Sequence, residues 1–200
     1  MYGQDFWNER YEGADYFYGT EPNSFLAENA DLLTGPVLSL CEGEGRNAVF
    51  LAQRGLRVLG VDCSDIGLQK AQELARSRKV TIETQLADLA DYTPREEEFG
   101  SVISISAHLP GSIRQRLYPH VEKALKPDGI FILEAYTENQ LARSTGGPKD
   151  RDMLMSVDKL RRELPSLNVL LAREIDRHVV EGTGHTGMAS VVQFIARKKA

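Results

Sequence analysis

Short apolar runs alternate with amphipathic stretches through the middle of the chain. Runs rich in apolar and β-branched residues occupy positions 37–41, 57–61, 79–84, 101–105 and 129–133. Because these runs lack the alternation expected of a strand with one wetted face, they predict strands buried on both sides. Strands that alternate with helices predict an α/β fold, with helices on both faces of a mostly parallel sheet.

The stretches between these runs have helical features. Residues 46–54 place apolar side chains on one face, and Gly55 follows as a stop signal. Ser64 can cap the next helix, and a further helix begins near Ser112. Pro119 lies inside that last helix, where its missing N–H predicts a kink or two short helices.

The end of the chain departs from this alternation. Residues 169–180 and 188–196 both resemble strands in composition, and only residues 181–187 separate them. This connection is too short for a crossover helix, so the two strands are expected to form an antiparallel hairpin. The sequence therefore predicts a doubly wound, Rossmann-like α/β sheet that is mostly parallel and ends in an antiparallel hairpin.

The first 36 residues do not follow the alternation either. Seven of the 15 aromatic residues fall within the first 18 positions. Packing into the core would explain this cluster. A cap folded over a ligand would also explain it, because aromatic side chains give large contact area at low entropic cost. We expect a single domain with an aromatic-rich cap segment at 1–36 and a Rossmann-like core at 37–200.

Composition and charge narrow the class of protein. The chain has 200 residues, 42% hydrophobic and 26% charged, with a net charge of −5, which suits a globular enzyme. Its basic run at 197–199 is too short to indicate a nucleic-acid-binding face. No apolar stretch reaches the roughly 20 residues that span a bilayer, and the start lacks the pattern of a secretory signal. With two cysteines, the chain is expected to be cytoplasmic, with a small-molecule substrate and neither nucleic-acid nor membrane partners.

Residues suited to binding a nucleoside follow three successive predicted strands. In an open α/β sheet, ligands bind beyond the carboxyl ends of the strands. After the first strand, Gly43 and Gly45 allow a sharp turn and a close approach of a ligand to the main chain, and Glu42 can accept from an amino group. The helix that follows offers free N–H groups to a carboxylate or phosphate.

Two acidic residues extend this site along the next strands. Asp62 ends the second strand, where a carboxylate can accept hydrogen bonds from two ribose hydroxyls. Asp88 follows the third strand and can accept from the exocyclic amine of an adenine, with Leu89 packed against the ring. Three further residues at these strand ends are expected to lie near the same ligand: Cys41, Cys63 and Ser64.

The glycines also match a second pattern. Gly43-x-Gly45-x-x-Ala48 satisfies the dinucleotide-binding fingerprint, which places a pyrophosphate at the turn. Glu42 and Glu44 flank the glycines and would repel pyrophosphate, and a terminal hairpin is atypical of that fold. S-adenosylmethionine carries an ammonium and a carboxylate in place of phosphates, and is therefore the favoured cofactor.

These motifs together resemble a known family. Residues 37–45 resemble the first motif of the class I S-adenosylmethionine-dependent methyltransferases. Asp62 is similar to that family's ribose-binding acid, residues 88–89 to its adenine site, and residues 125–129 to the turn before its fifth strand. The resemblance implies a seven-stranded sheet whose antiparallel last strand lies between the fifth and sixth strands.

Two segments are similar to one branch of that family. Residues 6–11 and 45–47 resemble the tellurite-resistance and thiopurine methyltransferase branch, in which an N-terminal aromatic segment caps the cofactor. That resemblance implies that Arg10 faces the methionine carboxylate, where a guanidinium can form a bidentate pair. Three positions depart from the family's usual acid, glycine and aspartate, and indicate a distinct subgroup: Ser39, Cys41 and Gly100.

The acceptor of the methyl group is predicted only as a class. A small thiol or metalloid oxyanion would need little or no base, whereas a hydroxyl or amine must lose a proton. The candidate bases are His108, after the fourth strand, and His185, in the glycine-rich segment before the last strand. Residues 143–149 form a loop that is either a substrate lid or ordinary surface. No residues have the spacing of metal ligands.

Two other functions remain open at this stage. The chain can be a non-catalytic S-adenosylmethionine-binding sensor or partner protein, since nothing in the motifs separates binding from catalysis. A nicotinamide-dependent oxidoreductase is the less favoured alternative, because Glu42 and Glu44 would repel a pyrophosphate at the glycine turn and the terminal hairpin is atypical of that fold.

Overall fold

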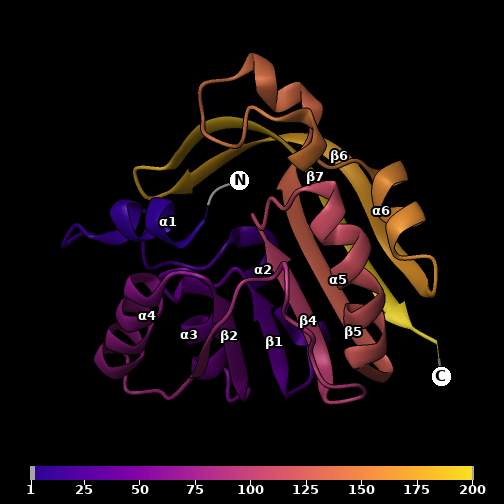
Figure 1. Ribbon diagram of the computed structural model, residues 1–200, viewed down its shortest axis with the longest axis horizontal. Coiled ribbons are helices and arrows are strands. Elements are labelled where there is room, and N and C mark those ends of the chain that lie inside the picture. The colour runs from indigo at the N-terminus through magenta and orange to yellow at the C-terminus, as the bar shows by residue number, and fades with distance from the viewer. Residues whose placement is uncertain (1–2, 200) are drawn as a thin grey trace.

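The computed structural model describes residues 3–199, which contain a seven-stranded sheet with helices on both faces (Figure 1). The strand order is β3-β2-β1-β4-β5-β7-β6, with β1 to β5 parallel and β7 antiparallel to both its neighbours. The predicted doubly wound sheet with its antiparallel hairpin is confirmed, including the last strand between the fifth and sixth. The strands are β1 Val37–Leu40, β2 Val58–Asp62, β3 Glu83–Leu86, β4 Phe99–Ile105, β5 Leu125–Tyr136, β6 Leu167–Glu181 and β7 His185–Lys198.

The helices divide between the two faces of the sheet. α2, α3 and α4 pack on one face, and α5 and α6 pack on the other. Phe131 and Ile132 are adjacent in β5 and belong to different hydrophobic clusters, one on each face. This explains the continuous apolar runs, because a strand covered on both faces needs no polar alternation. The helices are α1 Gln4–Tyr11, α2 Ser24–Glu28, α3 Arg46–Gln53, α4 Asp65–Ser77, α5 Gly111–Ala124 and α6 Val157–Glu163.

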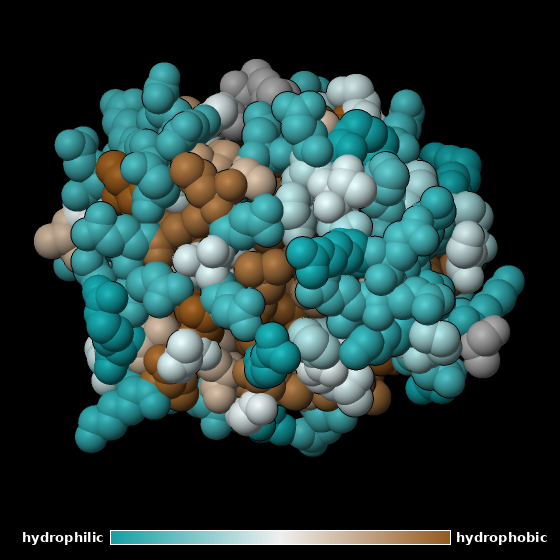
Figure 2. Space-filling view, turned by 60° about the horizontal axis from the view of Figure 1, so that its bottom comes forward, coloured by the Kyte–Doolittle hydropathy of each residue, from teal (hydrophilic) through white to brown (hydrophobic). Residues whose placement is uncertain are grey.

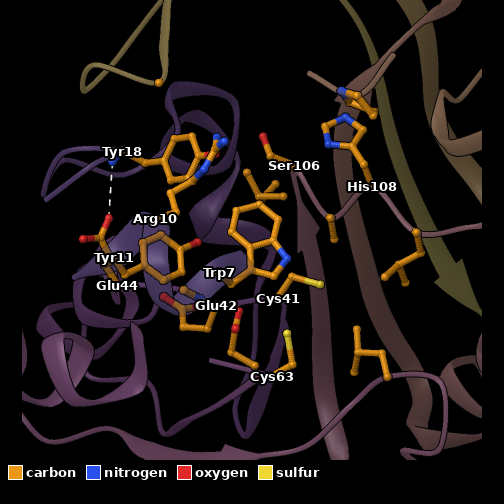
Figure 3. A pocket seen from close by; sticks show the side chains of 18 of the residues that line it. Trp7, Arg10, Tyr11, Tyr18, Cys41, Glu42, Glu44, Cys63, Ser106 and His108 are labelled. Atoms are coloured by element: carbon orange, nitrogen blue, oxygen red, sulfur yellow. Dashed lines mark hydrogen bonds between the residues drawn. The ribbon is translucent and has the colours of Figure 1, made fainter. Parts of the chain in front are cut away.

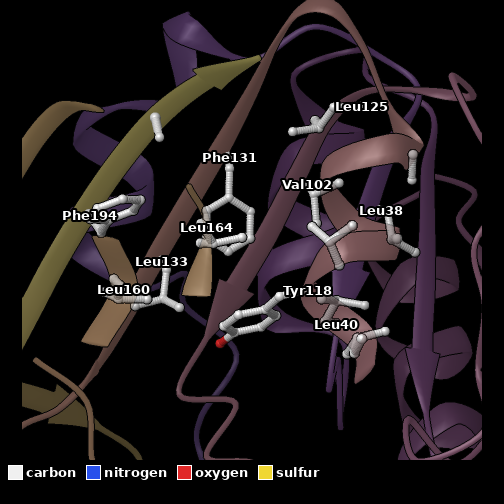
Figure 4. Close-up of a cluster of buried hydrophobic side chains, with 14 of the residues drawn as sticks. Leu38, Leu40, Val102, Tyr118, Leu125, Phe131, Leu133, Leu160, Leu164 and Phe194 are labelled. Atoms are coloured by element: carbon white, nitrogen blue, oxygen red, sulfur yellow. The ribbon is translucent and has the colours of Figure 1, made fainter. Parts of the chain in front are cut away.

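A large hydrophobic cluster fills the space between the sheet and helices α5 and α6 (Figure 4). Phe131 is fully buried at its centre, and its ring centroid lies 6.4 Å from that of Tyr118 and 6.4 Å from that of Phe194. Tyr118 comes from α5 and Phe194 from β7. The ring contacts therefore join a helix, a parallel strand and the terminal hairpin into one core.

Two predicted elements differ in the structure. The third strand is Glu83–Leu86 rather than 79–84, because α4 continues to Ser77 and the chain then turns through Lys79 at a φ of 59°. These residues complete the end of the helix instead of starting the strand. Pro119 lies inside α5 and does not divide it into two helices.

The terminal hairpin is longer than predicted and reaches over the edge of the sheet. β6 has 15 residues and β7 has 14, so His185 is the first residue of β7 rather than part of a long turn. In Figure 1 the turn of this hairpin lies close to helix α1, above α4 and to the left of the upper ends of β1 and β4, and residues of both segments line the cavity at this edge. The edge at which ligands bind in this kind of sheet is therefore covered by the first and last segments of the chain.

The surface shows how completely the core is enclosed. On the face in Figure 2, hydrophilic side chains cover most of the view, and hydrophobic side chains gather mainly to the left of the centre. Large apolar residues at the surface are few, and the most exposed is Val180 at 75%. Such isolated apolar side chains are normal on folded proteins and carry no functional argument.

Phe131→Ala tests the core. We expect the substitution to lower the free energy of unfolding by about 3–5 kcal/mol, because it removes a buried ring and leaves a cavity between α5 and β7. Urea unfolding followed by circular dichroism measures the change. Leu170→Ala is the control, since Leu170 is 49% exposed and should shift the free energy of unfolding by less than about 0.5 kcal/mol. Equal effects of the two substitutions would contradict this account of the core.

Candidate active site

A cavity of about 380 Å³ lies beyond the carboxyl ends of the strands, in the size range of small-molecule sites. Its walls come from the ends of β1, β2 and β4, the N-terminal segment, the loop at 146–148 and the β6–β7 turn (Figure 3). Ten of the twelve site residues predicted from the sequence line it: Arg10, Cys41, Glu42, Gly43, Asp62, Cys63, Asp88, Leu89, His108 and His185.

The other two predicted residues serve the fold. A Cβ at Gly45 would lie 2.6 Å from Cα of Ala71, so this glycine lets α3 approach α4 and does not face the cavity. Ser64 caps α4 by accepting from Gly67 N at 2.9 Å, and donates to Asn8 Oδ1 at 2.6 Å. Gly45 and Ser64 therefore lie outside the cavity lining and serve helix packing and helix capping, and their contact with a cofactor stays a prediction.

The turn after β1 is held in shape by buried carboxylates. Cys41 adopts a φ of 54°, in the left-handed region where a glycine is common, and Gly43 adopts 59°. Glu42 accepts from Ala48 N at 3.0 Å and from the Ser39 hydroxyl. Burial raises the pKa of Glu42 to about 7, even though these two hydrogen bonds act in the opposite direction. Both oxygens of Glu42 thus stabilise the turn, and its contact with a ligand amino group stays a prediction.

Asp62 joins the turn to the end of β2. Its Oδ2 accepts from Gly43 N at 2.8 Å, and its Oδ1 accepts from Ser64 N at 2.8 Å. Burial raises the pKa of this carboxyl, while the backbone hydrogen bonds act to lower it. Each carboxylate oxygen has a second lone pair, so Asp62 can still accept from hydroxyls in the cavity.

Asp88 is exposed at the cavity edge beside buried Leu89, and its Oδ1 accepts from Ala90 N at 2.8 Å.

The two cysteines lie side by side in the cavity wall, below Trp7 in Figure 3. Burial, together with the nearby carboxylates of Asp62 and Asp88, raises the pKa of the Cys63 thiol to about 12. Burial likewise raises the pKa of Cys41 well above its ordinary value. Both thiols are therefore protonated at neutral pH, which suits packing and not nucleophilic chemistry.

The N-terminal segment forms a cap over the glycine turn, as one of the two explanations of its aromatic residues predicted. Trp7 and Tyr11 stack with ring centroids 5.7 Å apart, and the Tyr11 hydroxyl fills the space beside Gly43 that a Cβ would need. Phe6 and Tyr18 also line the cavity, whereas Tyr16 packs against the core. Tyr2 lies outside the described residues.

A buried lysine that the sequence did not single out fastens this cap. Lys70 of α4 is 8% exposed and donates to the backbone oxygens of Tyr11, Gly13 and Asp15 at 3.2, 2.9 and 2.7 Å. Its Nζ also lies 2.6 Å from Glu44 Oε1, and Glu44 Oε2 accepts from the backbone N of residue 18 at 3.3 Å. The sequence does indicate that Lys70 is buried, because it lies four residues before Leu74 and therefore falls on the apolar face of its helix.

The far end of the cavity is lined by aromatic rings. His108 stacks on Tyr136 with centroids 5.2 Å apart at 14°, and His185 lies 4.6 Å from Tyr18 and 5.2 Å from Tyr136. We call this part, which is lined by Tyr18, His108 and His185 and has Tyr136 packed against the two imidazoles, the aromatic chamber. The loop at 146–148 closes it, and a Cβ at Gly147 would lie 2.5 Å from the Tyr136 ring.

The two candidate bases differ in their surroundings. His108 Nε2 accepts from Tyr136 N at 3.0 Å, and burial together with His185 lowers the pKa of His108 to about 3. These features favour a structural role for His108 in the chamber wall over removal of a proton. His185 Nδ1 lies 3.4 Å from Glu181 Oε2, the arrangement of an imidazole oriented by a carboxylate. Its role as a base stays a prediction.

Hydrogen bonds and an ion pair hold the loop at 143–149, which was predicted to be either a substrate lid or ordinary surface. Gln140 Nε2 donates to Thr145 Oγ1 at 2.8 Å and to Gly146 O at 3.0 Å, and the Tyr136 hydroxyl donates to Thr145 O at 3.2 Å. Arg143 pairs with Asp176 at 2.6 Å.

Within residues 3–199, no cluster of side chains suits a metal ion, and no helix is long and apolar enough to cross a membrane.

Comparison with known families identifies part of the chain directly. Residues 37–129 match the family described as a methyltransferase domain. A curated relative, 2-heptyl-1-hydroxyquinolin-4(1H)-one methyltransferase of Mycobacteroides abscessus, is 26% identical over 117 residues, which cover 57% of this chain and 52% of that protein. The chain spans only 34% to 52% of the length of the curated relatives that it matches.

Solved structures share the fold over almost the whole chain. One, described as "Conversion of a Disulfide Bond into a Thioacetal Group during Echinomycin Biosynthesis", has a TM-score of 0.78 at 20% identity and covers 98% of this chain and 92% of its own. TehB from Haemophilus influenzae has a TM-score of 0.70 at 16% identity, over 98% of this chain and 67% of its own. At these identities the likeness shows the fold alone.

Glu42→Gln tests the pKa of the buried carboxyl. A carboxyl whose folded pKa is about 7, above its ordinary 4.5, contributes stability below pH 4.5 and loses it as the pH rises through 7. The neutral amide avoids this loss, so we expect the variant to be about 1–3 kcal/mol more stable than the parent chain at pH 8 and equal to it near pH 4.5. Urea unfolding at both pH values measures the difference. Exposed Glu28→Gln is the control, and a Glu42→Gln variant that is less stable at pH 8 would contradict the assignment.

Lys70→Met tests the attachment of the cap. Removing the ammonium leaves Glu44 buried without its counter-charge, so we expect the free energy of unfolding to fall by about 3–5 kcal/mol. The backbone oxygens of residues 11–15 also lose their donor, so chymotrypsin should cleave within the first 18 residues sooner than in the parent chain. Arg76→Met, on an exposed position of the same helix, should change neither measurement. An unchanged cleavage rate in Lys70→Met would show that the cap is held by other contacts.

The described residues suit S-adenosylmethionine. Asp62 and Asp88 offer carboxylate acceptors at the ends of β2 and β3, and the rings of Trp7 and Tyr11 offer faces that attract a cation such as a sulfonium. Arg10 has no carboxylate partner among residues 3–199, which suits a ligand that brings its own carboxylate. The match of residues 37–129 to a methyltransferase domain, the shared sheet topology and this site together make the chain similar to the class I S-adenosylmethionine-dependent methyltransferases.

Proposed function

We propose that this chain transfers a methyl group from S-adenosylmethionine to a small-molecule acceptor. The observation that carries the proposal is one cavity with two unlike ends. The end beside β1 and β2 has the carboxylates and the glycine turn of a nucleoside site, and the other end is the aromatic chamber. A chamber enclosed by the cap, the 146–148 loop and the β6–β7 turn suits a small acceptor better than a large one.

Particular residues would hold the cofactor at the first end. Asp62 would accept from the ribose hydroxyls, Asp88 from the adenine amine, and Leu89 would pack against the adenine. Arg10 would pair with the methionine carboxylate, because its guanidinium lies over the Phe6 ring at 4.8 Å and donates only to the Tyr18 hydroxyl, at 3.3 Å, among residues 3–199. When bound, the cofactor supplies a methyl group already activated by its sulfonium.

The chain itself contributes position and exclusion of water. The cap covers the turn, and the chamber holds an acceptor near the methyl group, so that the two reactants meet in one orientation. His108, with a pKa of about 3, is too weak a base to take a proton from a hydroxyl or amine at neutral pH. This supports an acceptor that needs little or no base, such as a thiol or a metalloid oxyanion.

The nicotinamide alternative is disfavoured by the turn. A glycine-rich turn binds pyrophosphate through free backbone N–H groups. Here Gly43 N already donates to Asp62 at 2.8 Å, and Glu42 and Glu44 place two buried carboxyl groups beside it.

The small-molecule acceptor is further supported by the curated relative named for a hydroxyquinolinone methyltransferase. A net charge of −5 disfavours a nucleic-acid acceptor, and we infer a cytoplasmic site of action from the charge and cysteine content.

A methyl-transfer screen tests the proposal. The chain is incubated with S-adenosylmethionine and panels of thiols, metalloid oxyanions, phenols, amines and carboxylates, and release of S-adenosylhomocysteine is measured. Release that depends on one acceptor class supports the proposal and identifies the class. Calorimetric binding of S-adenosylhomocysteine without turnover on any panel favours the non-catalytic sensor or partner protein. Tight binding of a nicotinamide dinucleotide with no S-adenosylmethionine binding would overturn the cofactor assignment.

Asp88→Ala tests the adenine end. Asp88 lines the cavity, and Asp91, in the same turn, is exposed and does not. We expect Asp88→Ala to weaken S-adenosylhomocysteine binding by about 0.5–1.5 kcal/mol, the usual worth of one hydrogen bond. Asp91→Ala, the matched control, should bind as the parent chain does. Isothermal titration calorimetry measures both, and equal affinities for the two variants would remove Asp88 from the site.

A further inference from the structure

An arginine at the start of α3 is only partly paired at the cavity wall. Arg46 is 7% exposed and lines the cavity, and its Nη2 lies 2.8 Å from Glu181 Oε2. Its Nη1 is buried and has no hydrogen-bond partner within residues 3–199. A buried charged donor without an acceptor is costly, so an acceptor from outside the chain is the natural partner for this group.

The charges around Arg46 are balanced within the protein. Glu181 also accepts from Asn23 at 2.8 Å and lies 3.7 Å from Arg177, which pairs with Glu134 at 2.6 Å. The two guanidiniums, of Arg46 and Arg177, are thus balanced by two carboxylates, of Glu134 and Glu181. Arg10 has no carboxylate partner in the described part of the chain, and the proposed function pairs it with the carboxylate of the cofactor. The unmet group at this part of the cavity wall is therefore the Arg46 Nη1 donor and not a net charge.

The position of Arg46 favours the acceptor over the cofactor as the source of that anion. Arg46 shares Glu181 with His185, whose ring lies 4.6 Å from that of Tyr18 and 5.2 Å from that of Tyr136. Arg10 belongs to the cap, where the proposed function assigns it the single carboxylate of the cofactor. Arg46 reaches the chamber from α3, on the side of His185, through their common partner Glu181.

We propose that the methyl acceptor carries a carboxylate or comparable oxyanion group that accepts a hydrogen bond from Arg46 Nη1. The inference rests on the proposed function and narrows its acceptor to anionic compounds. The rings that line the chamber, those of Tyr18, His108 and His185, suit a small planar body attached to that anionic group.

Ligand binding to the protein saturated with S-adenosylhomocysteine tests this inference. Benzoate and benzamide are the probes, because they have the same shape and only benzoate is anionic. Saturation fills the cofactor's own carboxylate site, so the probes report on the rest of the cavity. Arg46→Lys keeps a cation beside Glu181 and removes the second N–H group, and Arg10→Lys is the matched control from the cap. Urea unfolding checks that both variants fold.

We expect the parent chain to bind benzoate at least about tenfold more tightly than benzamide, as measured by ligand-observed NMR titration. Arg46→Lys should lose that preference and keep its affinity for S-adenosylhomocysteine within about twofold. Arg10→Lys should lose affinity for S-adenosylhomocysteine and retain the preference for benzoate once it is saturated. The preference of the parent chain tests the proposal even if Arg46→Lys does not fold.

Three results would overturn the inference. They are equal or absent binding of benzoate and benzamide by the parent chain, an unchanged preference in Arg46→Lys, and a tenfold loss of S-adenosylhomocysteine affinity in that variant. The last would show that Arg46 serves the cofactor. In each of these cases binding of S-adenosylhomocysteine by the parent chain leaves the proposed function intact, whereas failure to bind it overturns both.

Discussion

A buried ammonium group holds the site together. Lys70 carries its charge to a position that is only 8% exposed, where a charge is stable only if it is paired and hydrogen-bonded. Its partners are Glu44 on the glycine turn and three backbone oxygens within residues 11–15. Because these partners belong to different segments of the chain, the contacts that stabilise the ammonium also fix the cap over the turn.

The order of the strands explains why the cavity under the cap has two unlike ends. β1, β2 and β3 follow one another outward on one side of the sheet, and β4, β5 and β7 lie on the other. In the first group Asp62 ends β2 and Asp88 follows β3, whereas His108 follows β4 and His185 begins β7. The reversal of strand order between β1 and β4 thus places the two carboxylates and the aromatic chamber on either side of one crevice.

The sequence predicts those parts of this arrangement that depend on local pattern. Buried runs indicated the strands, and residues at strand ends indicated Asp62 and Asp88, because all parallel strands present their carboxyl ends at one edge. Gly45 and Ser64 lie outside the cavity lining, because a small or polar residue serves helix packing and capping as readily as a ligand. The pair of Arg46 and Glu181, 135 residues apart, was missed because a buried ion pair depends on tertiary structure that no local pattern specifies.

The aromatic chamber is the part of the site that is hardest to predict from the sequence, because three segments that are distant in the chain enclose it. Gly184 N donates to Phe17 O at 3.2 Å, and a Cβ at Gly146 would lie 2.7 Å from His185, so the cap, the loop and the hairpin turn fit only in combination. The cap also contacts Glu44 at the opposite end of the cavity through the backbone N of residue 18. A movement of the cap that opens the aromatic chamber must therefore disturb the glycine turn as well. One segment thus joins the two ends of the cavity, although the residues that line these ends follow strands on opposite sides of the reversal in strand order.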